Sequence, residues 1–537
     1  MAAKRKRTRS LQGQPKSATA AVPETDVAPT ASRSVLWLPV GFGLGILGLS
    51  FLPRVQQHPT LIWSFWLSSL VVLVWTWMLS QRLRAAEAGR GFDIALRKQH
   101  WIQAILHTSV FIYWGSYWPP VANHFWLLVG QLLFCYAFDM LLAWSRRERY
   151  TLGFGPFPIL FSTNLFLWFI DDFFYLQFLM LGVGFLGKEF VRWERDGRRV
   201  HIFNPSAFSL GLFSLGLIFT GTTNATWGDQ IATTLNLAPQ PYLFLFAIGL
   251  VAMYFFNITL VSAFAAATLF GLSALYTQIV GVPFFIDSEI PIAVFLGLHL
   301  LVTDPSTSPR TPPGKLIFGL LYGATVFGLY ELLGQFQQPT FYDKLLCVPL
   351  LNLSVQWIDR VAAKLPQRFL VGEVQGIAIP RRANVFHMAV WAVFFVGMST
   401  IGAADGRHRG DSILFWEEAC ENDLRKGCAT LALLQFLDCS DGSGWSCNEL
   451  GAHYTEGAIV DPDSQVAAAL FNQACAQGSE PGCLNTANPG TPARGDPAVS
   501  DLRILLRQGR PTLNDWSEAE LYTRACEHGW TFACETP

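Results

Sequence analysis

Charged residues are scarce in this chain. Asp, Glu, Lys and Arg make up only 14% of its 537 residues, against about 25% in an average soluble protein. The 38 Lys and Arg are balanced by 39 Asp and Glu, so the chain has no global charge to attract a polyanion. These shortages exclude a disordered chain, a nucleic-acid binder and an ordinary soluble enzyme. Hydrophobic residues form 51% of the chain, which predicts that many of them face lipid.

Known catalytic motifs are also missing. The sequence has no P-loop, no G-x-G-x-x-G after a strand, no H-E-x-x-H and no C-x-x-C cluster, so we assign no catalytic residue and no metal site. Before residue 415 the only cysteines are Cys135 and Cys347. Each could ligate a metal centre at a subunit interface, but a free buried thiol is the favoured interpretation.

The first 34 residues are rich in Ala, Ser, Thr, Pro and basic side chains, and they contain almost no large apolar ones. Such a segment cannot bury enough surface to offset its ordering entropy, so we expect a disordered tail. The KRKR run could also be a nuclear signal or an RNA contact. A positive tail before a membrane span is the favoured alternative, and a cleaved signal peptide is not expected.

Apolar stretches of membrane-span length recur from Val35 to Ala403. We predict thirteen transmembrane helices, at 35–53, 60–80, 101–118, 124–144, 154–170, 173–187, 205–220, 241–257, 258–279, 288–303, 315–335, 343–360 and 386–403. If the tail is cytoplasmic, the inner loops carry 20 basic residues and the outer loops between spans only Arg54 and Lys344. This asymmetry predicts a multi-pass protein of a bacterial inner membrane, with a cytoplasmic N-terminus and a periplasmic C-terminus.

Eight of the ten cysteines follow residue 415 and form four pairs with one spacing, C-x7-C. In an outer compartment such pairs indicate disulfides, and a zinc site is the weaker alternative because no histidine or C-x-x-C spacing typical of zinc ligands accompanies them. The predicted disulfide cysteines are Cys420, Cys428, Cys439, Cys447, Cys475, Cys483, Cys526 and Cys534.

The same region repeats. An L-G-x2-Y-x2-G pattern precedes an Ala-rich amphipathic stretch that ends in a cysteine, and Cys439 and Cys475 are 36 residues apart, which is typical of a helix-pair repeat. Residues 412–537 resemble Sel1-like, tetratricopeptide-type repeats. The resemblance implies an α-solenoid that binds protein or peptide.

Two loop segments could form a site within the membrane part. Asn204-Pro205-Ser206 and Asp304-Pro305-Ser306 lie 100 residues apart, each at the cytoplasmic edge before a Gly-rich span. Matched breaks in two halves point to an internal repeat around a central site. Taken singly, Asn204 and Asp304 could simply cap helices; as a pair they favour a functional core.

These segments carry a family resemblance. LVTDPSTSPRTPPGKLIFGLLYG and HIFNPSAFSLGLF resemble segments of the membrane subunit shared by Rnf complexes (RnfD) and Na⁺-translocating NADH:quinone reductases (NqrB), in a branch similar to the UnbU-like proteins. The resemblance covers residues 95–362. It implies an all-α core of two related five-helix halves that carries flavin and passes electrons across the membrane. The expected domains are 1–34, 35–94, 95–362, 363–403 and 404–537.

The family attaches FMN to a threonine in an outer loop with a pattern like S-G-A-T-x-L. Here the corresponding loop offers Thr233, within Ala232-Thr233-Thr234-Leu235, and Thr226, after Ala225. The resemblance thus implies FMN or riboflavin, with Thr233, Thr226, Asn204, Ser206, Asp304 and Ser306 as candidate cofactor-binding residues. The alternative is a hydrophilic loop that holds no cofactor.

Ionisable residues inside spans are costly in lipid and therefore indicate function. Asp139, His299 and Glu331 are the candidates for an ion path, with structural pairing as the alternative. We expect a subunit that is not catalytic alone, working in a redox complex with other membrane or periplasmic subunits. The alternatives are a cofactor-free scaffold or a small-molecule transporter.

Overall fold

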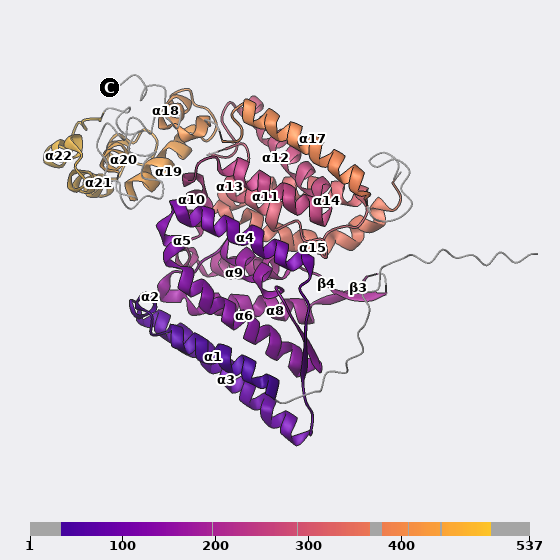
Figure 1. Cartoon of the computed structure of the whole chain (residues 1–537). Coiled ribbons are helices and arrows are strands. Elements are labelled where there is room, and N and C mark those ends of the chain that lie inside the picture. Colours follow the sequence, from indigo (N-terminus) through magenta and orange to yellow (C-terminus); the bar gives the residue numbers. More distant parts are fainter. Residues whose placement is uncertain are drawn as a thin grey trace, which may run out of the picture.

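The computed structural model describes residues 34–495, except 196, 287, 366–378, 406–407 and 441–442. Within this part the chain is mostly helical, as the composition predicted (Figure 1). The predicted tail up to residue 33, and the pair Cys526 and Cys534, lie outside the described residues.

The chain begins with two helices that precede the region of family resemblance. They are α1 (Trp37–Leu49) and α3 (Pro59–Ala85), joined by the short α2 (Pro53–Gln56). Both α2 and α3 start on a proline, whose fixed φ and missing N–H suit the first helical position. A parallel pair of short strands comes next, β1 (Gly91–Ile94) with β2 (Arg149–Leu152).

Ten longer helices follow, and we describe them as two sets of five. The first set is α4 (Lys98–Tyr117), α6 (Phe125–Arg146), α7 (Pro156–Asn164), α8 (Tyr175–Phe190) and α9 (Pro205–Thr220). The second set is α11 (Pro241–Phe256), α12 (Thr259–Val280), α13 (Ile292–Leu300), α14 (Pro312–Gln335) and α15 (Asp343–Ala362). In each set the third helix has only nine residues.

Short elements connect these helices. The first set contains α5 (Pro119–Asn123) and the antiparallel hairpin of β3 (Arg192–Arg195) and β4 (Arg198–His201), and α10 (Gly228–Thr234) joins the two sets. The β3–β4 hairpin lies at one end of the bundle, whereas α2, α5 and α10 lie at the other (Figure 1). We call these the hairpin end and the far end.

Every predicted span contains a helix, but thirteen helical crossings are not confirmed. Six helices are long and apolar enough to cross a membrane: α3, α6, α12, α14, the segment that ends with α15, and α17 (Arg381–Thr400). The predictions at 154–170 and 288–303 are wrong as continuous spanning helices. Nine residues rise only about 14 Å, half of a hydrocarbon core of about 30 Å.

Between residues 413 and 487 of the described chain there are five C-terminal helices, and each packs against the next. They are α18 (Ile413–Glu421), α19 (Gly427–Ser440), α20 (Gly444–Glu456), α21 (Ser464–Ala476) and α22 (Glu480–Ala487). Three of the predicted disulfides are confirmed: Cys420–Cys428, Cys439–Cys447 and Cys475–Cys483. Each closes the turn between two consecutive helices.

The C-terminal helices pack on the far end of the bundle. Val282, which comes after α12, is buried in one apolar cluster with Ile413 and Trp416 of α18. Near this cluster Lys426 Nζ lies 2.5 Å from Glu331 Oε2 at the end of α14. The apolar cluster and the ion pair together fix this domain against the membrane part.

Candidate functional site

The two Asx-Pro-Ser segments adopt the same local structure. Asn204 Oδ1 accepts hydrogen bonds from the backbone N–H and the hydroxyl of Ser206, at 3.1 and 2.8 Å. Asp304 Oδ1 accepts the same two bonds from Ser306, at 3.0 and 2.5 Å. A short acceptor side chain two residues before a serine favours this turn. The matched geometry is what an internal repeat would produce.

A third side chain joins the two turns. Asn352, buried in α15, accepts a hydrogen bond from the backbone N–H of Asn204 at 3.0 Å and donates one to the carbonyl of Thr307 at 3.2 Å. Asn204 itself donates to the carbonyl of Leu301, just beyond α13, at 2.9 Å. The segments separated by 100 residues therefore belong to one buried polar cluster. Sequence reasoning missed Asn352, whose signal is an amide within an apolar run.

His201 completes the link on the exposed side of this cluster. Its Nε2 lies 3.3 Å from Ser306 Oγ and 3.8 Å from Asp304 Oδ2. Burial alone would raise the pKa of Asp304, but the nearby His201 and the hydrogen bonds from Ser306 outweigh it and hold the pKa below its ordinary value. Asp304 is therefore an anion at neutral pH and keeps its acceptor role in the turn.

Arg195, at the end of β3, ties the hairpin to the second turn. Its Nη2 donates to the carbonyl of Ser308 at 3.1 Å and to Asp359 Oδ2 at 2.6 Å. Asp359 Oδ1 in turn accepts the backbone N–H of Arg310 at 3.3 Å. Ser308 Oγ is buried and has no hydrogen-bond partner among the described residues. Sequence reasoning counted Arg195 only as a basic loop residue.

The two turns differ in how they connect to the next helix. Asn204 is the N-cap of α9, whereas Asp304 does not cap α14. Thr311 caps α14 instead, because its Oγ1 accepts the N–H of Gly314 at 3.2 Å. The predicted equivalence holds for the turn itself but not for its position before the next span.

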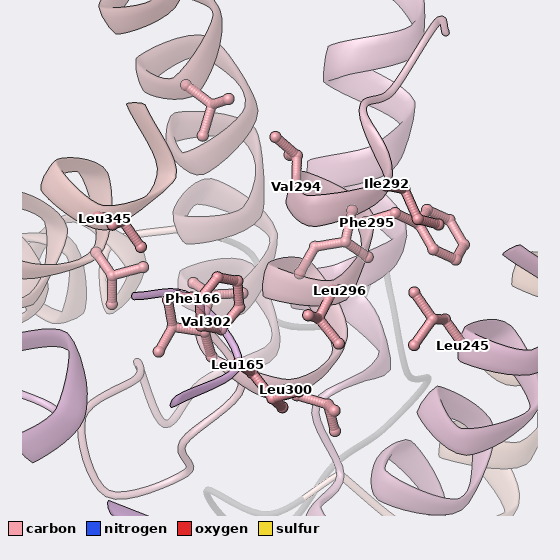
Figure 2. Packing of buried hydrophobic residues seen from close by; sticks show 14 of the residues in the cluster. Leu165, Phe166, Leu245, Ile292, Val294, Phe295, Leu296, Leu300, Val302 and Leu345 are labelled. Atoms are coloured by element: carbon pink, nitrogen blue, oxygen red, sulfur yellow. The ribbon is translucent and has the colours of Figure 1, made fainter. Parts of the chain in front are cut away.

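The nine-residue helices end inside the bundle, where the backbone needs partners. Leu165 and Phe166, after α7, lie beside Leu300 and Val302, at the end of α13 (Figure 2). Non-helical backbone at membrane depth is tolerated only where it is buried in protein or lines a cavity. Both helices fulfil this condition because their ends are buried against each other's segments.

Amide side chains satisfy the backbone at both breaks. After α7, Gln177 of α8 accepts the N–H of Phe169 at 3.0 Å and donates to the carbonyl of Leu167 at 3.2 Å. Gln177 also donates to Asn164, which donates to Gln131 at 2.8 Å. After α13 the corresponding role falls to Asn204 and Asn352. At both breaks amide side chains therefore satisfy the open backbone groups; of these amides the sequence singled out only Asn204, as a possible helix cap or part of a functional core.

The predicted ion-path residues do not form one cluster. Tyr150 donates to Asp139 at 3.1 Å, and Glu331 is paired with Lys426 of the C-terminal helices. His299 is buried in α13, with Nδ1 2.8 Å from the carbonyl of Phe295 and no partner for Nε2 among the described residues. Asp139 and Glu331 thus have the partners that structural pairing requires, whereas His299 Nε2 has none among the described residues.

Of the flavin candidates, the two threonines Thr226 and Thr233 lie at the far end, apart from the two Asx-Pro-Ser turns. Thr226 is buried and its hydroxyl donates to the carbonyl of Thr223 at 3.1 Å. An ester oxygen has no proton to donate, so attachment of FMN through its phosphate would break this bond and place a phosphate at a buried side chain; Thr226 as placed fits flavin attachment poorly. Thr233 belongs to α10, and its side chain lies outside the described residues.

In the part of the chain that the structure describes, no three His, Cys, Asp or Glu side chains lie close enough together to hold a metal ion. Cys135 and Cys347 are buried free thiols, the favoured interpretation of the sequence. Cys347 Sγ lies 3.7 Å from the carbonyl of Tyr322, its hydrogen-bond acceptor.

The six long apolar helices are those of a helical membrane protein, and the two turns are joined through Asn352. Comparison of the chain with protein-family models, with curated proteins and with solved structures gave no match.

Proposed function

We propose that this protein is an integral membrane electron-transfer subunit of the Rnf/Nqr type, working in a multi-subunit complex of the bacterial inner membrane. The observation that carries the proposal is the pair of Asx-Pro-Ser turns with identical hydrogen bonds, joined through Asn352. Two five-helix sets with a short third helix support it, since the resemblance implies such halves. The hairpin end, with its basic loops, would face the cytoplasm.

The test is the absorbance spectrum of the full chain purified in detergent, together with its mass and in-gel fluorescence. We expect a flavin spectrum, and fluorescence in the denatured band that Thr233→Ala abolishes. Thr226→Ala should keep the fluorescence because the Thr226 hydroxyl is buried and bonded to Thr223. Thr222→Ala, at an exposed threonine of the same loop, is the matched control. A purified protein without any flavin would contradict the proposal.

A second candidate function is a cofactor-free scaffold or small-molecule transporter on the same core. The poor fit of Thr226 to flavin attachment favours it, and so do the short helices, because broken helices in corresponding positions mark transporter sites.

On this proposal the C-terminal helices dock a protein partner. Deletion of 413–537 leaves Asp405 in place, whose carboxylate accepts the N–H groups of Tyr242 and Leu243 at the start of α11. Loss of a co-purifying partner on this deletion, with no flavin bound, would support it.

A further inference from the structure

A large cavity lies between α4, α6 and α7, apart from the polar cluster at the hairpin end. Its volume is about 1470 Å³, above the about 300–1,000 Å³ of ordinary small-molecule pockets. Phe111 and Leu128 line its wall, with Leu160 and Phe161 of α7. Along α4 the lining runs from Thr108 to Ser116, about 12 Å at the α-helical rise. The lining therefore extends far enough along α4 for part of an apolar chain to lie parallel to the helices.

The cavity opens between α4 and α6 toward the outside of the bundle. Ile112, Phe125 and Trp126 line it and are exposed, at 66%, 55% and 46%. In a membrane-spanning bundle such apolar side chains face lipid. A ligand would therefore enter from the bilayer.

At the far end of the bundle the mouth of the cavity is lined by polar side chains, and the charged ones are paired with each other. Arg54 Nη2 lies 2.8 Å from Asp171 Oδ1, and His58 Nε2 lies 3.8 Å from Asp171 Oδ2. All three residues line the cavity. Since the guanidinium and the carboxylate already neutralise each other, this mouth suits an uncharged head group.

His124 supplies a specific contact among the lining residues. It is 97% buried, and its ring stacks on Trp168 with centroids 4.4 Å apart. Nδ1 lies 2.7 Å from the carbonyl of Pro120, which can only accept, so Nδ1 carries the proton. In the neutral imidazole Nε2 is then an acceptor, and it has no partner among the described residues. A buried acceptor without a donor is costly. Nε2 has almost no exposed surface, so a hydroxyl from the cavity would satisfy it after a small shift of the ring or its neighbours.

We propose that this cavity binds an uncharged, hydroxyl-bearing, single-chain amphiphile from the bilayer, with its hydroxyl donating to His124 Nε2 and its apolar chain lying along Phe111, Leu128 and Leu160. The proposal uses neither the joined Asx-Pro-Ser turns nor a flavin, so it does not depend on the proposed function.

The test is photo-crosslinking of the full chain in phosphatidylcholine nanodiscs. Three probes share one diazirine-bearing C15 chain and end in a primary alcohol, its methyl ether or a carboxylate. We expect the alcohol to label peptides of α4, α6 and α7 about fivefold to tenfold more than the ether, the effect of one buried hydrogen bond. The carboxylate should label least, because the mouth has no free cation for it.

Matched variants separate the cavity from the hydrogen bond. Leu128→Trp narrows the cavity one helical turn from His124 and should reduce labelling by both neutral probes, whereas Ile105→Trp, on the exposed side of α4, should not. His124→Phe keeps a stacking ring, and His124→Asn keeps a donor near the Nδ1 position. Both should reduce alcohol labelling to the level of the ether. Equal labelling by alcohol and ether in the unmodified chain, or labelling unchanged by Leu128→Trp, would overturn the proposal.

Discussion

Single buried amide side chains provide the hydrogen bonds that the irregular backbone of the membrane part requires. Asn352, Asn204 and Gln177 each satisfy backbone groups that a broken helix leaves open. In an apolar interior the loss of such a partner costs more than the bond itself contributes, because the remaining group stays buried without a partner. The positions of these amides are therefore the most sensitive points of the core.

Replacement of Asn352 by leucine tests this view. The change roughly keeps the side-chain volume but removes the hydrogen bonds of Asn352 to the N–H of Asn204 and the carbonyl of Thr307. We expect a loss of about 2–4 kcal/mol in the free energy of unfolding, measured by denaturant titration in detergent. Leu353→Ala, at an exposed position next to it, is the control. Equal stability of Asn352→Leu and the unmodified chain would show that water replaces the amide.

Two titratable residues of the C-terminal helices predict opposite pH dependences. Burial, with the nearby Glu449 carboxylate, raises the pKa of Glu417 to about 7, so its contribution to stability falls as pH rises from about 4.5 to about 7. Burial, with the charge of Arg494, lowers the pKa of His453 to about 4, so its contribution falls as pH drops from about 6.5 to about 4.

A variant that removes one of these titratable groups leaves the pH dependence of stability that the other group produces. In Glu417→Gln the stability of the C-terminal helices should rise monotonically between pH 4 and 6.5, whereas in His453→Gln it should fall between pH 4.5 and 7. The measurement is hydrogen exchange of α18 and α20 in the full chain at a series of pH values, corrected for intrinsic rates. The same profile in both variants would refute the assignment.

Glycine positions control the helix turns of the C-terminal part. Gly427 and Gly482 each precede a disulfide cysteine, and each comes after an Ala-Cys pair, Ala419-Cys420 or Ala474-Cys475, at the same spacing. A Cβ on Gly482 would lie 2.6 Å from the Cβ of Ala474. The next helix therefore approaches the previous one only because these residues lack a side chain.

Replacement of Gly482 by alanine should loosen the α21–α22 turn. We expect a destabilisation of about 1–3 kcal/mol, as for other overpacked sites, with faster reduction of Cys475–Cys483 by a thiol reagent. Mass spectrometry of trapped thiols measures the rate. Gly490→Ala, where a Cβ meets open space, should leave this rate unchanged. A Gly482→Ala disulfide as resistant as that of the unmodified chain would contradict the close approach.

The C-terminal domain and the bundle are held mainly by apolar contact. Val282 and Trp416 are buried together, whereas the Lys426–Glu331 pair is partly exposed. Exposed ion pairs contribute about 0–1 kcal/mol, and two large buried side chains contribute more.

Val282→Asp should therefore release the domain while both parts remain folded. We expect faster hydrogen exchange in α18 and in the 281–291 segment, with α3 and α6 unchanged. Lys426→Ala should alter the exchange of these segments little. If Lys426→Ala had the larger effect, the ion pair rather than the apolar cluster would hold the domain.

The sequence by itself determined the features that depend on local composition. Apolar runs located every bundle helix, because burial in lipid requires continuous hydrophobic surface. The C-x7-C spacing located the three confirmed disulfides, because neighbouring helices bring such cysteines together at a turn. The repeated Asx-Pro-Ser turns were also readable, since a short acceptor before proline and serine favours one local geometry.

Only the tertiary structure decided how those pieces meet. Leu165–Ile170 is as apolar as a helix, yet it leaves the helical path because Gln177, in α8, satisfies its backbone. Asn352 links the two turns from a helix that is remote in sequence, and Lys426 pairs with Glu331 across two domains. Such hydrogen bonds and ion pairs depend on positions in space, which no local pattern of residue types specifies.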